Sequence, residues 1–298
     1  MTDYDTSHDG PIGGLPPADP VLLRNPQIEA ALVEIRFSGV EHEVASKVAF
    51  RVRDAAERSG FEFPQMRATQ SQEITVRIED GKALPDLQER ASGWQMATED
   101  GHLAVTLLPG VFAVQATKYE RWRTTLEPVL AQVAEAVEAT MSPAMLNRVG
   151  VRFINRLTRA DAESPLAWKD AINPTFLGSL LDPNIGPKVV GTQQQAEVRL
   201  GPAKGALIRH GLFSDTARLG AYSYLVDLDV FDQAASPFEA DRIVTTARTL
   251  DRTALSLFQQ IVLPSYRATM NPYARVDATG TVIATVDRKQ SDVEGGER

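Results

Sequence analysis

Apolar and polar residues alternate along residues 148–158, near the middle of the chain. Successive side chains of a β-strand point to opposite faces, so a period of two predicts a strand there. One face is mostly apolar and the other is basic. The first carries Val149, Val151, Phe153, Asn155 and Leu157, and the second carries Arg148, Gly150, Arg152, Ile154 and Arg156.

The segment before this strand predicts a strand, a helix, four strands and a helix. The first strand covers residues 30–37, and a helix with one apolar stripe follows over residues 43–59. The four strands are expected at residues 73–78, 94–98, 102–108 and 111–118, with Asp100-Gly101 and Pro109-Gly110 as tight turns. The closing helix covers residues 120–140. Pro128 either kinks it or marks a regular part that starts near Thr125.

The segment from residue 148 onward predicts nearly the same order. Short helical stretches are expected at residues 166–172 and 175–181, followed by strands at 194–200, 205–213 and 221–231. A long helix closes this half over residues 237–263. Ser236 as N-cap, Pro237 at the first helical position and Glu239 at the third fit a capping box. A short edge strand is expected at 281–286.

Together these patterns predict an α+β fold of two β-α-β(3-4)-α units, with antiparallel sheets and helices packed on one face. Val33, Ile35, Arg36 and Phe37 align with Val149, Val151, Arg152 and Phe153. The shared element order favours an internal duplication more than these residue matches do. The expected divisions are a disordered arm at 1–24, a first β-α-β4-α unit at 25–142, a second β-α-β3-α unit at 143–270 and an irregular charged tail at 271–298.

Two resemblances follow from these segments. Two such units in sequence resemble the TATA-binding-protein-like fold, an analogy of architecture that carries no function. The stretch from Leu23 to Phe37, together with Arg148-Val149-Gly150-Val151-Arg152-Phe153-Ile154-Asn155-Arg156, resembles a sporadically distributed family of uncharacterised bacterial proteins. The resemblance covers residues 22–262 and carries over no activity or site residue. The patchy distribution of that family implies a link to mobile-element or defence genes.

Composition narrows the classes of function. The formal net charge of −8 and a pI near 5.2 disfavour non-specific binding to nucleic acid or anionic lipid. The chain has no cysteine, which excludes disulfides, thiolate metal sites and a cysteine nucleophile. Residues 1–19 lack the features of a signal peptide, and no apolar run reaches the roughly 20 residues that span a bilayer. We therefore expect a cytoplasmic protein without membrane attachment.

Searches for catalytic motifs give negative results. The chain has no glycine-rich phosphate loop, no Gly-x-Ser-x-Gly elbow and no closely spaced histidine pair. No metal site and no cofactor are predicted. His210 is the only histidine expected in the middle of a strand, where a structural histidine is favoured over a functional one.

Two charged patterns are candidate sites. Asp227 and Asp229 share one strand face, about 6.5–7 Å apart, as a cation site or an acid–base pair would require. The solvent face of a half-buried strand also explains them, and this interpretation is favoured because no third ligand is evident. Arginines form the second pattern, and they are Arg36, Arg148, Arg152, Arg156 and Arg209. Their planar forks suit an anion or peptide site, whereas pairing with the two aspartates needs no ligand.

Three functions remain open. The absence of catalytic motifs favours a non-enzymatic binding protein that docks a protein partner through a sheet face or edge. Exposed strand edges also favour homodimers. A nucleic-acid-binding protein that uses the basic sheet face is the second alternative, against which the acidic charge argues. The third is an enzyme without a recognisable motif that uses Asp227, Asp229 and His210.

Overall fold

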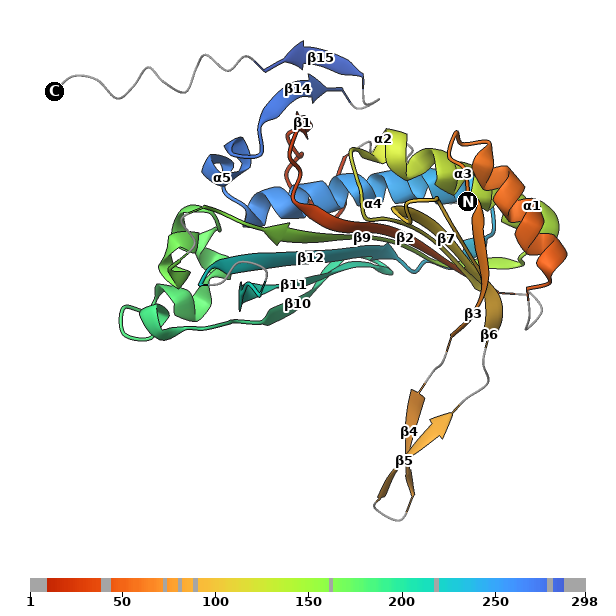
Figure 1. Cartoon of the computed structure of the whole chain (residues 1–298), viewed down its shortest axis with the longest axis horizontal. Coiled ribbons are helices and arrows are strands. Elements are labelled where there is room, and N and C mark those ends of the chain that lie inside the picture. The colour runs from red at the N-terminus through yellow and green to blue at the C-terminus, as the bar shows by residue number, and fades with distance from the viewer. Residues whose placement is uncertain are drawn as a thin grey trace.

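The computed structural model describes residues 10–38, 44–71, 74–79, 82–87, 91–160, 163–216, 220–277 and 281–286, with the backbone alone from 70 to 91. Within these residues the fold is α+β, and its strands pair antiparallel. Figure 1 shows one long, curved sheet with the helix α4 (Ala240–Ile261) lying along it.

A ten-stranded sheet forms the centre of the molecule, in the order β10-β11-β12-β9-β2-β8-β7-β6-β3, with β13 beside β9. Its strands are β2 (Ile28–Ser38), β3 (Gln65–Ser71), β6 (Ala91–Ala97), β7 (Leu103–Leu108), β8 (Val111–Ala116), β9 (Met145–Leu157), β10 (Gln194–Gly201), β11 (Lys204–Ser214), β12 (Tyr222–Asp232) and β13 (Ser236–Pro237). The two strands that open the predicted halves, β2 and β9, pair with each other in the middle, with Val33 opposite Val151. The sheet is therefore continuous across both halves.

Two small sheets stand apart from the central one. A hairpin of β4 (Ile74–Glu79) and β5 (Lys82–Leu87) projects away from it in Figure 1. The other small sheet joins β1 (Val21–Leu23), β14 (Pro272–Val276) and β15 (Val282–Thr285). The strand predicted at 73–78 thus belongs to the hairpin. Its place at the sheet edge is taken by β3, whose mostly polar sequence lacks the apolar alternation that reveals a strand.

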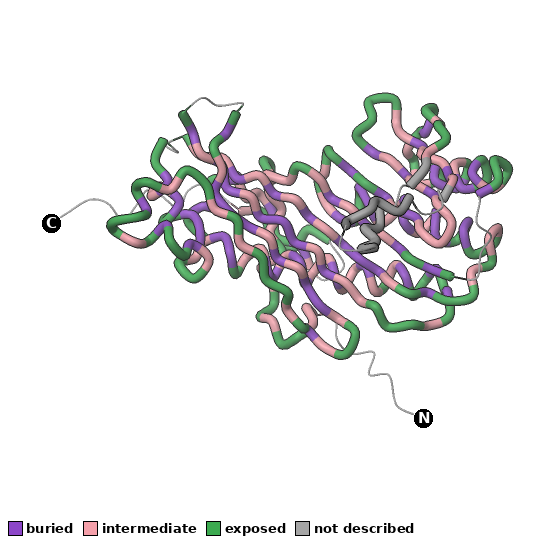
Figure 2. Tube along the Cα trace, turned by 90° about the horizontal axis from the view of Figure 1, so that it is seen from below, coloured by how far each residue is buried: buried purple, intermediate pink, exposed green. Residues whose placement is uncertain are grey.

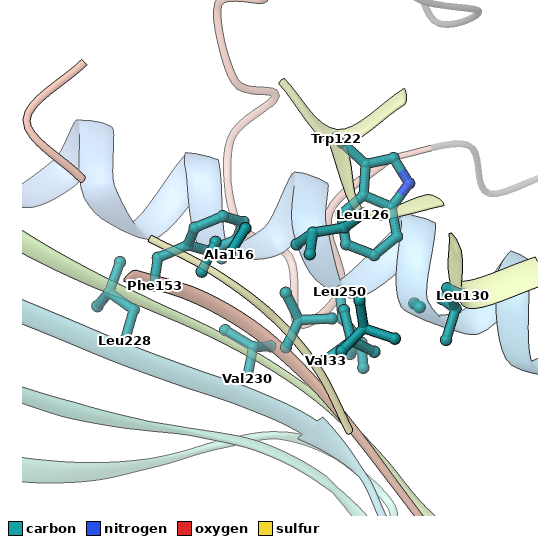
Figure 3. Packing of buried hydrophobic residues seen from close by; sticks show 14 of the residues in the cluster. Val33, Ala116, Trp122, Leu126, Leu130, Phe153, Leu228, Val230 and Leu250 are labelled. Atoms are coloured by element: carbon teal, nitrogen blue, oxygen red, sulfur yellow. The ribbon is translucent and has the colours of Figure 1, made fainter. Parts of the chain in front are cut away.

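The helices are α1 (Ser46–Glu57), α2 (Trp122–Thr125), α3 (Glu127–Met141), α4 (Ala240–Ile261) and α5 (Pro264–Ala268). α4 contacts β9 and β12, α3 contacts α4, and α1 contacts α3. Figure 3 shows the resulting core, in which Leu250 of α4 and Leu126 and Leu130 meet Val33, Phe153 and Val230 of the sheet. The apolar faces predicted for the first and middle strands point into this core.

Two helix starts test the sequence predictions. The regular helix begins at Glu127 with Pro128 in its first turn, so the second alternative for Pro128 is confirmed. The capping box at Ser236 is wrong, because Ser236 and Pro237 pair with β9 as β13 and α4 begins at Ala240. A carboxylate oxygen of Glu138 in α3 accepts a hydrogen bond from the Ala240 backbone nitrogen instead, at 3.2 Å.

The link from β9 to β10 also differs from the prediction. Its ordered turns are 3₁₀ helices, namely η1 (Pro165–Asp170), η2 (Pro174–Phe176), η3 (Gly178–Leu181) and η4 (Gly186–Lys188). Three of them carry a proline at their start, and proline removes the donor that a continuing α-helix requires. No α-helix is described between β9 and β10, so the second unit does not show the predicted β-α-β order.

Both ends of the chain are more ordered than predicted where the structure describes them. From residue 10 the arm lies along α4: Thr253 Oγ1 accepts from the Ile12 backbone nitrogen at 3.2 Å, and Ser256 Oγ donates to the Pro16 carbonyl at 2.7 Å. It then pairs with the C-terminal segment through β1 and β14. The arm predicted as disordered is thus docked over residues 10–23, and residues 1–9 lie outside the described part. Among the described helices, none has the length and apolar character needed to cross a bilayer.

Candidate functional site

The predicted arginines lie on the face of the sheet that points away from α4, here called the arginine face. Figure 2 views the molecule from this side and shows strands in which buried and partly exposed residues alternate. Arg152 in β9 donates to both carboxylate oxygens of Asp227 in β12, through Nε and Nη2 at 2.7 Å each. Arg209 of β11 adds a third contact to Asp227 at 3.3 Å. These hydrogen bonds raise the pKa of Arg152.

Arg148 bridges two strands on this face. Its guanidinium donates to Glu34 in β2 at 3.1 Å and to Asp229 in β12 at 2.8 Å. Glu34 also accepts from Arg36 at 2.8 Å. Gly150 explains why Arg148 can lie flat along the strand, since a Cβ at that position would collide with the guanidinium.

Arg156 pairs with a residue that the sequence patterns did not single out. Its Nη2 donates to Asp215 at 2.5 Å, and Ser223 Oγ donates to the other carboxylate oxygen at 2.7 Å. The guanidinium also lies over the ring of Phe213, 5.5 Å from its centre. Asp215 follows β11 in the chain, outside any alternating pattern, so only the folded strands bring it to Arg156.

The five predicted arginines and both aspartates therefore form three ion-pair clusters: Arg36 and Arg148 with Glu34 and Asp229, Arg152 and Arg209 with Asp227, and Arg156 with Asp215. The predicted pairing with Asp227 and Asp229 is confirmed for Arg148, Arg152 and Arg209. Arg36 pairs with Glu34 instead, and Arg156 pairs with Asp215. Each arginine has a carboxylate within 4 Å, and with Glu29, which lies 3.9 Å from Arg156, five carboxylates balance the five arginines across the face. This balance leaves no arginine here in excess for an anionic ligand.

His210 lies on the opposite face of β11 from Arg209. Its Nδ1 is 2.8 Å from the Tyr224 hydroxyl, which donates to the Phe176 carbonyl at 3.1 Å. Burial lowers the pKa of His210. The sheet separates this imidazole from Asp227 and Asp229, so the three residues of the predicted enzyme alternative do not converge. Nor do any three His, Asp or Glu side chains within the described ranges gather as a metal would require.

The face of the sheet that α4 contacts, here called the helix side, holds a cavity of about 250 Å³ that no sequence pattern indicated. Its floor comes from β9 and β12, one wall from α4, and another from the segment that leads into α2. The arm and the C-terminal segment form the rest. The apolar lining consists of Pro20, Val21, Leu22, Leu23, Pro26, Ile28, Trp122, Phe153, Leu228, Ala254, Leu255, Phe258, Met270 and Val276.

Two carboxylates near this cavity differ in their surroundings. Glu127 accepts from Arg248 at 2.9 and 3.1 Å and from Trp122 Nε1 at 2.5 Å. Burial opposes its ionisation, but the contacts with Arg248 prevail and lower the pKa of Glu127. Asp251 lines the cavity, and burial raises its pKa to about 7, although Arg252 partly offsets the effect. Burial raises the pKa of the Tyr119 hydroxyl, and the nearby negative charge of Asp251 raises it further.

Sequence patterns did not identify the cavity residues because these residues come from six separate segments of the chain. Phe153, Asn155 and Leu228 belong to strands that the alternation predicted, and there they count as core. The available sequence signal for this cavity is a charged residue within the helical pattern of residues 237–263. Several residues of that helix are charged, so this signal does not distinguish Asp251 from the others. Comparison with known proteins adds no relative: no family model matches the chain, and no curated protein matches it either.

Proposed function

We propose that the chain is a non-enzymatic binding protein whose arginine face docks another protein. The observation that supports this most is the composition of that face. Between the ion pairs lie partly exposed apolar side chains: Leu32 beside Arg152, Ile154 beside Asp227, Leu225 beside Arg156 and Leu207 beside Asp229. Apolar groups that reach solvent across several central strands are typical of an interaction surface.

The charge balance indicates the chemistry of the partner. A protein surface with apolar side chains and hydrogen-bonding groups could cover the face without breaking its ion pairs. A nucleic acid would have to draw arginines away from the carboxylates that hold them, and those carboxylates would repel its phosphates. We therefore place a protein partner ahead of nucleic acid, and a second copy of the chain is one form that such a partner can take.

The test replaces the apolar side chains and leaves the ion pairs in place. Purified wild type, the double variant Ile154→Glu/Leu225→Glu and the control Phe50→Glu would be immobilised and exposed to native lysate. Phe50 is 46% exposed on α1, away from the arginine face, so it matches the chemical change. A partner held by wild type and control but lost with the double variant supports the proposal.

Equal capture by all three proteins would contradict the role of this face. Circular dichroism must show that the double variant keeps its fold, since both residues lie on central strands. Sedimentation velocity of the same three proteins separates self-association from binding of a different chain. A dimer that dissociates only in the double variant would identify the partner as a second copy.

We also propose that the two halves arose by duplication, with their helices on one face of the sheet. Each half begins with a central strand that pairs on its outer side with the last strand of the same half, β2 with β8 and β9 with β12. An offset of 116 residues (150 − 34) relates Glu34 to Gly150, its own cross-strand neighbour. A two-fold axis at this pair would relate the halves. We further propose that the chain belongs to the sporadically distributed bacterial family that it resembles. Its gene would then be linked to mobile-element or defence genes.

A further inference from the structure

The cavity on the helix side is independent of the proposed docking surface, because the central sheet separates them. Its volume of about 250 Å³ corresponds to on the order of eight water molecules at roughly 30 Å³ each. Ligand sites are usually somewhat larger, which limits an occupant to a small molecule. Aromatic rings of Tyr119, Trp122, Phe153 and Phe258 line it, so most of the occupant must be apolar.

The polar groups inside this lining include both kinds: Arg121, Arg123, Arg248 and Arg252 can donate, and Glu120, Asn155, Asp251 and Asp277 can accept. Asp251 accepts no hydrogen bond from any residue that the structure describes, although it lines the cavity. Asn155 donates its side-chain amide to the Val226 carbonyl at 3.0 Å, which leaves its side-chain oxygen available as an acceptor. Asp251 is half-buried among apolar side chains, where an ionised carboxylate without a donor is costly, and a ligand that supplies the donor lowers that cost.

Charged groups around Asp251 come from every neighbouring element. They are Arg248 and Arg252 on α4, Glu127 on α3, Tyr119, Glu120, Arg121 and Arg123 before and within α2, and Asp277 after β14. Arg248 is held by Glu127, and Arg252 also has interactions of its own. Arg123 is exposed to solvent. Among the partly buried charged residues of the lining, Arg121 and Asp251 have no side-chain hydrogen bond to a described residue. Burial disfavours the ionised form of Asp251 and raises its pKa, so a donor from a ligand would stabilise its carboxylate, which favours a cation there.

We propose that this cavity binds a small, mainly apolar molecule with a protonated amine. The amine donates to the carboxylate of Asp251, and the side-chain oxygen of Asn155 is a second acceptor. The apolar body lies against Trp122, Phe153 and Phe258, whose rings also favour a nearby cation.

The pH dependence of binding follows from the pKa of Asp251 near 7. An aliphatic amine stays protonated between pH 6 and pH 8, whereas the ionised fraction of Asp251 rises about tenfold over that range. Affinity should therefore rise about tenfold from pH 6 to pH 8 in the wild type. This trend should vanish when the carboxyl is replaced by an amide.

Isothermal titration calorimetry with three probes of similar shape tests the proposal. The probes are 2-phenylethylamine, 2-phenylethanol and 3-phenylpropionate, which carry a cationic, a neutral and an anionic group. The amine should bind best, and Asp251→Asn should weaken it by about 10- to 100-fold, as loss of a charged hydrogen bond does. Asp241→Asn, at an exposed aspartate of the same helix, is the matched control and should bind as wild type does.

A third variant, Leu255→Trp, fills the cavity and should abolish binding of the amine. Any of three results would overturn the proposal. They are no saturable binding of 2-phenylethylamine, equal affinities for the amine and the alcohol that do not change in Asp251→Asn, and tighter binding of 3-phenylpropionate than of the amine. The last would identify an acid-binding site instead. Because none of these measurements involves the arginine face, failure here leaves the docking proposal untouched, and the reverse holds as well.

Discussion

The two faces of the central sheet handle charge in opposite ways. On the arginine face each guanidinium meets a carboxylate, most of them on neighbouring strands, so the register of the sheet supplies the partners. On the helix side Asp251 lies in a cavity built from distant segments, and no described residue donates to it. Charges paired by register contribute to the fold. A charge left without a donor opposes folding and is more easily explained by an occupant.

The largest expected effect is a pH-dependent gain of stability in Asp251→Asn. The raised pKa means that the folded protein holds this proton more tightly than the unfolded chain does, so its stabilising effect is complete below about pH 4 and is lost as pH rises through about 7. The amide does not ionise, so the variant should be more stable than wild type by on the order of 2–4 kcal/mol at pH 8, and equal to it near pH 4.

Urea unfolding of both proteins at several pH values between 4 and 8 measures this difference. Asp241→Asn, at an exposed position, should show almost none of it. A gain in the free energy of unfolding that is the same at every pH would mean that ionisation of Asp251 is not its source. The two faces of the sheet would then not differ in how their charges affect stability.

The next effect concerns the arginine face and has the opposite sign. Asp227 is 4% exposed and accepts from Arg152 and Arg209, so Asp227→Ala leaves two guanidiniums without their carboxylate. We expect a loss of about 2 kcal/mol, a value limited by solvent because Arg152 is 37% exposed. Asp229→Ala should cost about 1 kcal/mol, since Arg148 keeps its contact with Glu34.

Urea unfolding at neutral pH compares the two variants, and Arg152→Ala combined with Asp227→Ala completes a double-mutant cycle. A coupling energy near zero would show that the pair contributes nothing, in spite of its geometry. Equal losses for Asp227→Ala and Asp229→Ala would contradict the order that burial predicts.

The smallest effect tests whether the arm is a true wall of the cavity. Ser256→Ala removes the hydrogen bond to the Pro16 carbonyl and should cost about 0.5–1.5 kcal/mol. Hydrogen exchange should speed up over residues 12–23, while β9 and β12 keep their protection. Thr249→Ala serves as control, because its hydroxyl bonds within the helix to the Thr245 carbonyl. Unchanged exchange in the arm would mean that other contacts hold it.

Patterns that depend on local periodicity predicted the arginine face well. The alternation at residues 148–158 placed Arg148, Arg152 and Arg156 on one side, and the turns at Gly101 and Gly110 have the positive φ that their dipeptides suggest. The pairing with Asp227 and Asp229 follows once the strands are neighbours. Glu34 and Asp215 were missed because their roles depend on which strands meet, and the sequence of one strand does not specify its neighbour.

The cavity could not be predicted by the same means. Its walls join the arm, whose composition suggests disorder, to a C-terminal segment with little regular pattern. What orders the arm is a set of contacts some 240 residues apart along the chain, such as Ser256 with Pro16 and Asp19 with Gln259. Composition measures how much apolar surface a segment can bury on its own, and it says nothing of a helix that will later lie beside it.

The pairing of β2 with β9 has a consequence for synthesis of the chain. Val33 can pair with Val151 only after the ribosome has added 118 more residues (151 − 33). This interval lasts roughly 6–24 s at a translation rate of 5–20 residues per second. During that time the first half carries an open strand edge with apolar residues such as Leu32, Val33 and Ile35, which invites pairing with other nascent chains. Sites where the ribosome pauses between the two strands would lengthen this exposure. Production of the protein should therefore benefit from chaperones that bind extended apolar segments.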